Sequence, residues 1–211
     1  ESQRRAATPE AQAAFAEEIT PFEVGGRKPF TADKDEHPKP DTTLETLAKL
    51  RPAFAKDGTV TAGNASGIND GAASVVLGRE SAVAERGLTG LVSLEAVATA
   101  AMEPELMGYA PTHALRALFE KTGTSPSDIG SIELNEAFAS QAVAVIRDTE
   151  LDPARVNPYG GAIALGHPVG ATGAILTLRL AKDMVRRDLE LGIVTMCIGG
   201  GQALAAMFRR I

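Results

Sequence analysis

Three short segments in the second half of the chain carry the side chains best suited to chemistry. Residues 157–173 read NPYGGAIALGHPVGATG and place His167 among glycines, just before a long amphipathic stretch. Residues 197–202 read CIGGGQ, so the single cysteine, Cys197, precedes three glycines. Residues 135–138 read NEAF and place Asn135 ahead of an expected helix. A thiol, an imidazole and an amide beside glycine-rich backbone indicate acyl transfer with donors for an oxyanion.

Each of these residues also has an ordinary structural interpretation. His167 could be a loop histidine bonded to a backbone carbonyl, Cys197 a packed strand residue, and Asn135 a helix cap. A phosphate-binding loop is disfavoured, because no Gly-Lys-Ser/Thr is present and no strand directly precedes the glycines. Considered alone, the residue types would make Cys197 a nucleophile and His167 its base.

Composition limits the class of protein. The chain has 211 residues, 44% hydrophobic and 23% charged, which is enough to bury a core in about one or two domains. The net charge of −6 disfavours general binding to nucleic acid, and one cysteine excludes an internal disulfide. There is no long apolar span and no signal-peptide pattern. We therefore expect a cytoplasmic protein, and the start at Glu1 suggests a piece of a longer chain.

The elements that must position these residues alternate between helices and strands, which predicts an α/β fold. In the first half, Thr8 and Pro9 are typical of a helix start. The remaining pattern predicts helix up to about residue 20, polar loop over 24–43, a short helix at 44–50, strand at 72–77, helix at 81–86 and strand at 91–97.

The second half has a more regular pattern. Pro111 begins an expected helix that Gly123 ends. The remaining predictions are a strand at 132–134, helices at 138–147 and 170–187, and a hairpin of strands 191–197 and 203–208 joined by residues 198–202.

The three segments, together with GNASGINDGA at residues 63–72, resemble the signature blocks of thiolases, the acetyl-CoA acetyltransferases and 3-ketoacyl-CoA thiolases. The resemblance implies an α/β fold in five layers (α/β/α/β/α), of which the C-terminal half and part of the loop domain are present. It implies three regions: 1–68, the latter part of a CoA-binding loop domain; 69–89, the last strand and helix of the N-terminal domain; and 90–211, the C-terminal domain.

The resemblance reverses the assignment of Cys197. In thiolases the matching cysteine is the acid/base that deprotonates acetyl-CoA in Claisen condensation or protonates the leaving carbon in cleavage. His167 matches the histidine that activates a separate nucleophilic cysteine and helps to bind the thioester oxygen. Asn135 matches the residue that holds a catalytic water in the same oxyanion hole. The N–H of Gly199 would belong to the second hole.

The resemblance also implies substrates and partners. Coenzyme A thioesters would be the substrates, in reactions of fatty acid metabolism, without a metal or prosthetic group. Ser66, Lys39, Met107 and Phe138 would contact the CoA thioester, although they also suit a turn serine, a solvated lysine and two core residues. The full-length protein would be a homo-oligomer, a dimer or tetramer, without nucleic-acid or membrane partners.

One feature departs from the family pattern. The nucleophilic cysteine of thiolases lies in the N-terminal domain, and this chain has no second cysteine. We therefore expect that the chain is inactive by itself and that the strand at 72–77 lacks its partners. Two alternatives are a non-catalytic CoA-binding or interaction subunit and a sterol-carrier-type thiolase relative. The intact His167 and CIGGG block favour the catalytic branch.

Overall fold

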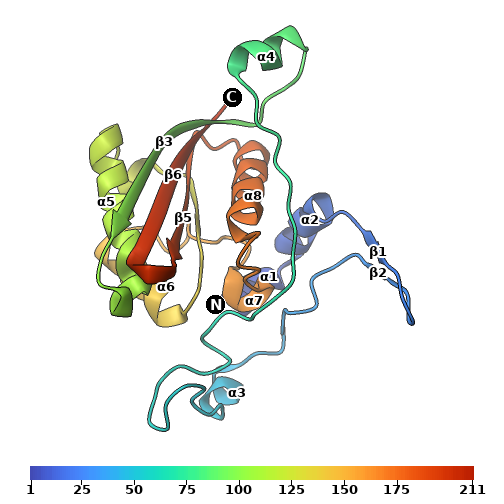
Figure 1. The fold of residues 1–211 in the computed structure, drawn as a ribbon, viewed down its shortest axis with the longest axis vertical. Coiled ribbons are helices and arrows are strands. Elements are labelled where there is room, and N and C mark those ends of the chain that lie inside the picture. The colour runs from blue at the N-terminus through green and yellow to red at the C-terminus, as the bar shows by residue number, and fades with distance from the viewer.

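The computed structural model describes residues 1–211 as a layered α/β body from which an extended N-terminal region projects (Figure 1). The body is built on a four-stranded sheet in the order β3-β6-β5-β4. Its strands are β3 (Val92–Ala101), β4 (Ser131–Leu134), β5 (Leu191–Ile198) and β6 (Gln202–Arg210). β4 runs parallel to β5, and the other neighbouring pairs are antiparallel.

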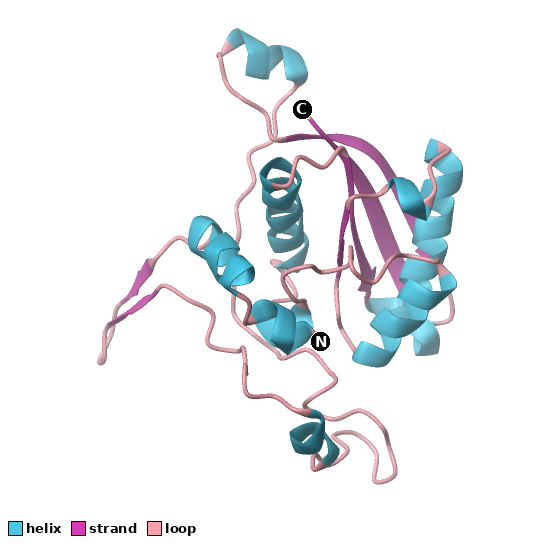
Figure 2. Ribbon diagram, turned by 180° about the vertical axis from the view of Figure 1, so that it is seen from behind, coloured by secondary structure: helices cyan, strands magenta, loops and turns pink.

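Helices cover both faces of this sheet, as the two opposite views show (Figures 1 and 2). α5 (Ala110–Thr122) and α6 (Ala139–Asp148) lie on one face, over the main core, which includes Leu118, Ile132 and Ile193. α8 (Thr172–Arg186) lies on the other face and packs Leu180 and Met184 against Val194. The alternating side chains of β5 thus pack against the helices on both faces of the sheet. This arrangement confirms the predicted α/β class.

Sequence signals account for most element boundaries in the body. Gly123 ends α5 in the left-handed conformation with φ of 67°, which glycine adopts without steric cost. The predicted hairpin forms between β5 and β6, through the short 3-10 turn η3 (Gly199–Gly201). Two further short 3-10 helices are η1 (Pro104–Tyr109) and η2 (Pro126–Asp128), and α7 (Ala162–Leu165) precedes His167.

The N-terminal region contains short elements joined by long loops. They are α1 (Ser2–Ala6), α2 (Pro9–Glu18), β1 (Phe22–Val24), β2 (Phe30–Ala32), α3 (Leu44–Ala48) and α4 (Glu80–Glu85). The Thr8 side chain caps α2 by accepting from Ala11 N, as predicted. The loop predicted over 24–43 is partly wrong, because β1 and β2 pair as a small antiparallel hairpin.

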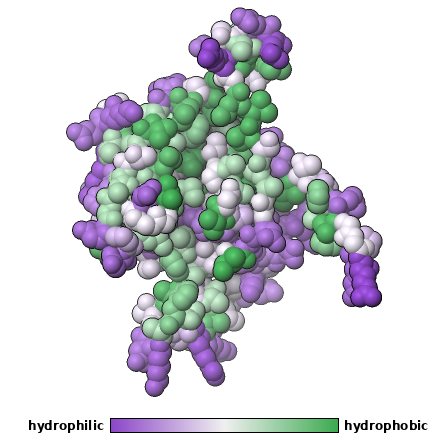
Figure 3. Space-filling model, in the orientation of Figure 1, coloured by the Kyte–Doolittle hydropathy of each residue, from purple (hydrophilic) through white to green (hydrophobic).

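The strand predicted at 72–77 does not form. These residues follow an extended, irregular path beside α8, where no strand pairs with them. Val76 and Leu77 are 94% and 88% exposed, and apolar atoms are visible below α4 where the segment meets the sheet (Figure 3). An apolar sequence favours a strand only where a neighbour supplies the hydrogen-bond ladder. No helix of the structure has the length and apolarity needed to cross a bilayer.

Candidate active site

Strand β4 directs Asn135 toward α8. Ile132 and Leu134 belong to the core beneath α5 and α6, and Glu133 lies near Arg179 of α8. Because side chains alternate along a strand, Asn135 continues on the Glu133 side. It is 1% exposed, and its Oδ1 makes no hydrogen bond within the chain. Its backbone N donates to Thr195 O of β5 at 3.0 Å. Asn135 does not cap α6, which begins at Ala139, so that alternative is wrong.

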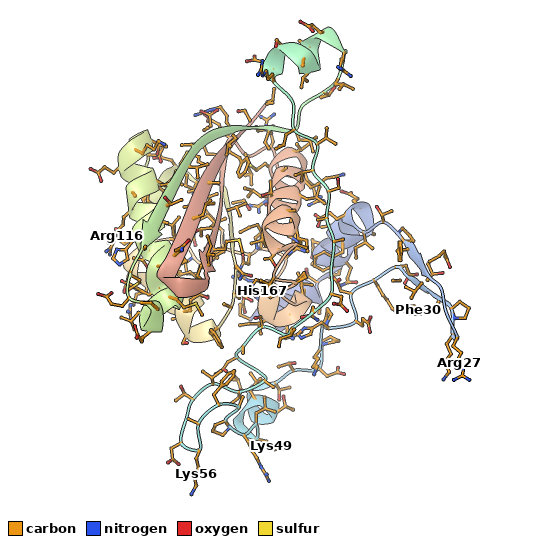
Figure 4. All side chains as sticks on the ribbon, in the orientation of Figure 1. Arg27, Phe30, Lys49, Lys56, Arg116 and His167 are labelled. Atoms are coloured by element: carbon orange, nitrogen blue, oxygen red, sulfur yellow. The ribbon has the colours of Figure 1, made fainter.

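His167 meets Asn135 at the start of α8. Its Nε2 lies 3.3 Å from Asn135 Nδ2, and its Nδ1 lies 2.7 Å from Thr172 Oγ1. The ring is thus held by two side chains rather than by a backbone carbonyl, contrary to the ordinary interpretation of a loop histidine. Burial lowers the pKa of His167 below its usual value, which favours the neutral imidazole. Figure 4 labels His167 between the sheet and α7, in the body of the molecule.

The segment 64–69 joins these two parts of the site. Ser66 N donates to Ala137 O at 3.0 Å, and Ala65 forms a β-bridge with Phe138. Further along, Ile68 forms a parallel bridge with the residue His167. The segment therefore runs from the start of α6 to the histidine loop, and it brings three of the four sequence blocks into contact.

Glycine 166 allows this close approach. Its φ is +93°, and a Cβ there would lie 2.4 Å from the side chain of Asn69. Asn69 Oδ1 in turn accepts from His167 N at 3.3 Å. Any larger residue at position 166 would displace Asn69 and, with it, the backbone of the histidine.

Cys197 lies near the carboxyl end of β5, two residues beyond Thr195, whose carbonyl accepts from Asn135 N. It is 8% exposed, and burial raises the pKa of its thiol. No hydrogen bond joins Cys197 to His167. Beyond it, Gly199 and Gly200 have open space where a side chain would be, and Gly200 has φ of +75°. The backbone after the thiol is therefore accessible to a small ligand.

The expected CoA contacts are dispersed. Ser66 and Phe138 are half-buried neighbours across the bridge described above. Met107 is half-buried in η1, which packs against η3 beside Cys197. Lys39 lies on the loop after β2, where its backbone N donates to Gln3 Oε1, and its exposed side chain makes no hydrogen bond or ion pair. The structure thus brings Asn135, His167, Ser66 and Phe138 together and leaves Lys39 at the surface.

Three site-building residues were not recognised from the sequence: Asn69, Asn157 and Thr172. All lie inside the four sequence blocks; the side chains of Asn69 and Thr172 contact His167, and that of Asn157 contacts Leu134, just before the block 135–138. Asn157 and Thr172 are buried polar residues, 3% exposed each. Their positions within glycine-rich blocks were the available signal, because short polar side chains there often bond to backbone.

Comparison with known proteins identifies the family. The family model described as "Thiolase, C-terminal domain" matches residues 88–210, and "Thiolase, N-terminal domain" matches residues 1–81. The chain belongs to the thiolase family. The resemblance noted from the four sequence blocks is thereby confirmed.

Individual relatives agree with this assignment. The chain is 48% identical to the acetyl-CoA acetyltransferase of Thiocystis violacea over 212 aligned positions, covering 100% of this chain and 54% of the relative. It is 47% identical to the beta-ketothiolase BktB of Cupriavidus necator, covering 100% of this chain and 54% of that protein. The crystal structure of the Bacillus anthracis acetyl-CoA acetyltransferase matches with a TM-score of 0.96 and 42% identity, over 100% of this chain and 54% of the other. The chain thus spans about half the length of these relatives, and its fold is that of a thiolase.

Proposed function

We propose that this chain supplies the acid/base half of a thiolase site, for acyl transfer between coenzyme A thioesters. In this proposal Cys197 is the acid/base. His167 activates the nucleophilic cysteine and helps to bind the thioester oxygen, and Asn135 holds a water in the same oxyanion hole. The N–H of Gly199 donates in the second oxyanion hole. The contact between His167 and Asn135 carries the proposal, because it unites residues of two sequence blocks that are 32 positions apart in the chain. Ser66 and Phe138, on either side of the adjoining bridge, would contact the substrate's pantetheine arm.

The environment of Cys197 supports the acid/base role rather than the nucleophilic one. A nucleophilic cysteine is commonly paired with a base or carries a lowered pKa. Cys197 has no hydrogen bond to His167, and burial raises the pKa of its thiol. At neutral pH such a thiol holds its proton, which it could donate to the carbon that leaves during cleavage. In the condensation direction its thiolate would be a strong base toward the α-carbon of acetyl-CoA.

The reaction needs a second cysteine, which this chain does not have. In the cleavage direction, that thiolate would attack the 3-keto carbonyl, the C–C bond would break, and Cys197 would protonate the released carbon. The acyl group on the nucleophile would then pass to the thiol of coenzyme A. We infer that the chain alone does not turn over.

A chimera tests the proposal. The part of the Bacillus anthracis relative that precedes the matched region, fused to this chain, would restore a complete thiolase length. We expect the chimera to cleave acetoacetyl-CoA with coenzyme A, and the 211-residue chain alone to show no turnover. Cys197→Ala in the chimera should lower kcat by about 10²–10⁴-fold, the usual contribution of general acid–base catalysis.

A matched control uses Thr177→Val on α8, where the hydroxyl bonds only to Gly173 O. This variant should keep the activity of the chimera. Turnover by the chain alone that disappears in Cys197→Ala would contradict the requirement for a second half. Full activity of the chimera carrying Cys197→Ala would contradict the role of the thiol.

A further inference from the structure

The hydroxyl of Thr172 occupies a position between a carbonyl and the imidazole. Thr172 is the first residue of α8 and is 3% exposed. Its Oγ1 lies 2.9 Å from Pro168 O and 2.7 Å from His167 Nδ1. Both distances are those of hydrogen bonds, so the single hydroxyl proton must be assigned to one of them.

The carbonyl decides this assignment. Pro168 O can only accept, so the short contact to Oγ1 is favourable when Thr172 donates to it. Oγ1 then faces His167 Nδ1 with a lone pair, and the proton in that bond must come from the ring. In the opposite tautomer the hydroxyl would turn to Nδ1, and two oxygen atoms would remain 2.9 Å apart without a proton between them. The geometry therefore favours a neutral ring protonated on Nδ1.

The other side of the ring agrees with this tautomer. The group that faces Nε2 at 3.3 Å is Asn135 Nδ2, a donor, so an unprotonated Nε2 can accept from it. The backbone of His167 is also fixed, because its N donates to Asn69 Oδ1. The ring is thus anchored at its backbone and at both nitrogen atoms.

We propose that Thr172 is a positioning residue whose hydroxyl holds His167 in the Nδ1–H tautomer and leaves the lone pair of Nε2 facing the site. The chemical consequence rests on the proposed function. An unprotonated Nε2 can accept the proton of an incoming thiol, and the resulting Nε2–H can donate to a thioester oxygen. A ring already protonated on Nε2 could not take the first of these steps.

Nitrogen NMR of the histidine rings tests the tautomer directly. The chain has three histidines, so selective ¹⁵N-histidine labelling gives a sparse spectrum. At about pH 9, where free imidazole is neutral, we expect the proton of His167 on Nδ1 in the unaltered chain and in Thr172→Ser. In Thr172→Val, which removes the hydroxyl but keeps the shape, we expect a shift of the population toward Nε2–H.

Two internal controls accompany this measurement. His37 Nδ1 lies 3.0 Å from Ala164 O, so that ring should also be protonated on Nδ1, and Thr172→Val should not change it. Thr177→Val removes a similar hydroxyl five residues further along α8 and should leave the His167 signals unchanged. Single His37→Gln and His113→Gln variants assign the three rings.

Three outcomes would overturn the proposal. They are an Nε2–H ring in the unaltered chain, an unchanged tautomer in Thr172→Val, and a Thr172→Ser spectrum that resembles Thr172→Val. If Thr172→Val does not fold, the unaltered chain and Thr172→Ser still give the first and third tests.

The chimera separates this proposal from the proposed function. With Thr172→Val we expect kcat to fall about tenfold or more with KM unchanged, and Thr172→Ser to restore it. An inactive chimera with the Nδ1–H tautomer intact counts against the proposed function alone. An active chimera with the Nε2–H tautomer counts against the role of Thr172 alone.

Discussion

Asn157 closes the free edge of β4 next to the site. Its Oδ1 accepts from Leu134 N at 2.9 Å, and its Nδ2 donates to Leu134 O at 2.8 Å. The side chain thus pairs with Leu134 as a neighbouring strand would, while β5 pairs on the other side. Its φ of 47° is one that asparagine tolerates better than most residues. Since Asn135 directly follows Leu134, this pairing also fixes the position of the amide that faces His167.

We predict that Asn157→Ala lowers the free energy of unfolding by about 2–5 kcal/mol. The substitution removes two hydrogen bonds and leaves the buried N–H and C=O of Leu134 without partners on that side. Urea unfolding followed by circular dichroism measures the change. Asn157→Gly, which keeps the backbone conformation but also lacks the side chain, should show most of the same loss. A loss below about 1 kcal/mol in both variants would contradict this account.

Among single residues, the structure brings together Asn135 and His167, two of the residues that the sequence blocks nominated. The motif blocks predict one site for Asn135, His167 and Cys197, whereas residue types alone suggest a Cys197–His167 pair, and no hydrogen bond joins those two residues. The partners of His167 were not predictable, since the contact with Asn69 spans 98 positions and depends on the path of the segment 64–69. Thr172, although only five positions from His167, contacts it because the turn at Pro168 bends the chain back.

Three elements meet around a buried group of charges behind the site. Arg179 of α8 lies 3.6 Å from Glu18 of α2 and 3.9 Å from Glu133 of β4. The Glu133 side chain is fully buried, and neither of its carboxyl oxygens makes a hydrogen bond. Burial, partly offset by Arg179 and reinforced by the nearby Asp183, Glu18 and Glu136, raises the pKa of Glu133 to about 8. Glu133 is therefore mostly protonated at pH 7, and Glu18, whose pKa burial also raises, is the other acidic neighbour of Arg179.

This raised pKa predicts a pH dependence of stability. The folded chain keeps the Glu133 proton up to about pH 8, whereas the unfolded chain releases it near pH 4.3. The unfolded state thus binds fewer protons between these values, and stability falls as pH rises, by at most about 1.4 kcal/mol per pH unit from this group. Glu133→Gln should flatten the dependence between pH 5 and pH 8, measured by urea unfolding at several pH values.

Glu120→Gln is the matched control, because Glu120 is exposed on α5. It should leave the slope of stability against pH unchanged. Equal slopes for Glu133→Gln and the unaltered chain would show that Glu133 is not protonated in the folded state.

At the element scale, prediction succeeded where periodicity and boundary signals agree. α8 was expected at 170–187 and forms as Thr172–Arg186, and the β5–β6 hairpin forms about its three glycines. The predictions failed in two segments of the N-terminal half. Residues 72–77 have strand composition but no neighbouring strand, whereas β1 and β2 pair within a segment that appears polar. Local sequence does not show whether residues 72–77 have a distant strand to pair with, whereas the β1–β2 pairing is local and was missed because the segment is polar.

The molecule as a whole consists of a packed body, to which α1 and α2 belong, and a weakly packed segment between residues 20 and 91. The three hydrophobic clusters draw on α1, α2 and the body, and none includes a residue between 20 and 91. The β1–β2 hairpin projects outward with Arg27 and Phe30 exposed, and Lys49 and Lys56 lie on a second projection (Figure 4). Since burial of apolar surface supplies most of the stability, opening of residues 20–91 should cost far less than unfolding of the sheet.

The exposed apolar segment 72–77 should therefore govern how the isolated chain behaves in solution. Val76 and Leu77 present nearly their whole side chains to water beside the groove between residues 69–73 and the start of α8. An unpaired apolar segment offers both backbone and side chains to a second molecule. We predict concentration-dependent self-association of the chain in size-exclusion chromatography with light scattering. The double variant Val76→Lys/Leu77→Lys should be mainly monomeric, because like charges at this segment repel.

Limited proteolysis tests the same property in another way, since cleavage requires a segment that opens locally. Elastase should cut within residues 72–77 and trypsin at the exposed Arg79 before either cuts β5 or β6. Hydrogen exchange should be fast across residues 72–77 and slow across β5, whose residues from Leu191 to Thr195 are buried.

Val185→Lys provides the control for the association experiment, because Val185 is also an exposed apolar residue, 46% exposed, but lies in a complete helix. It should leave the self-association unchanged. A monomeric chain protected from protease and exchange across residues 60–90 would show that this segment is packed in solution. That result would contradict the expectation that residues 72–77 lack a partner strand.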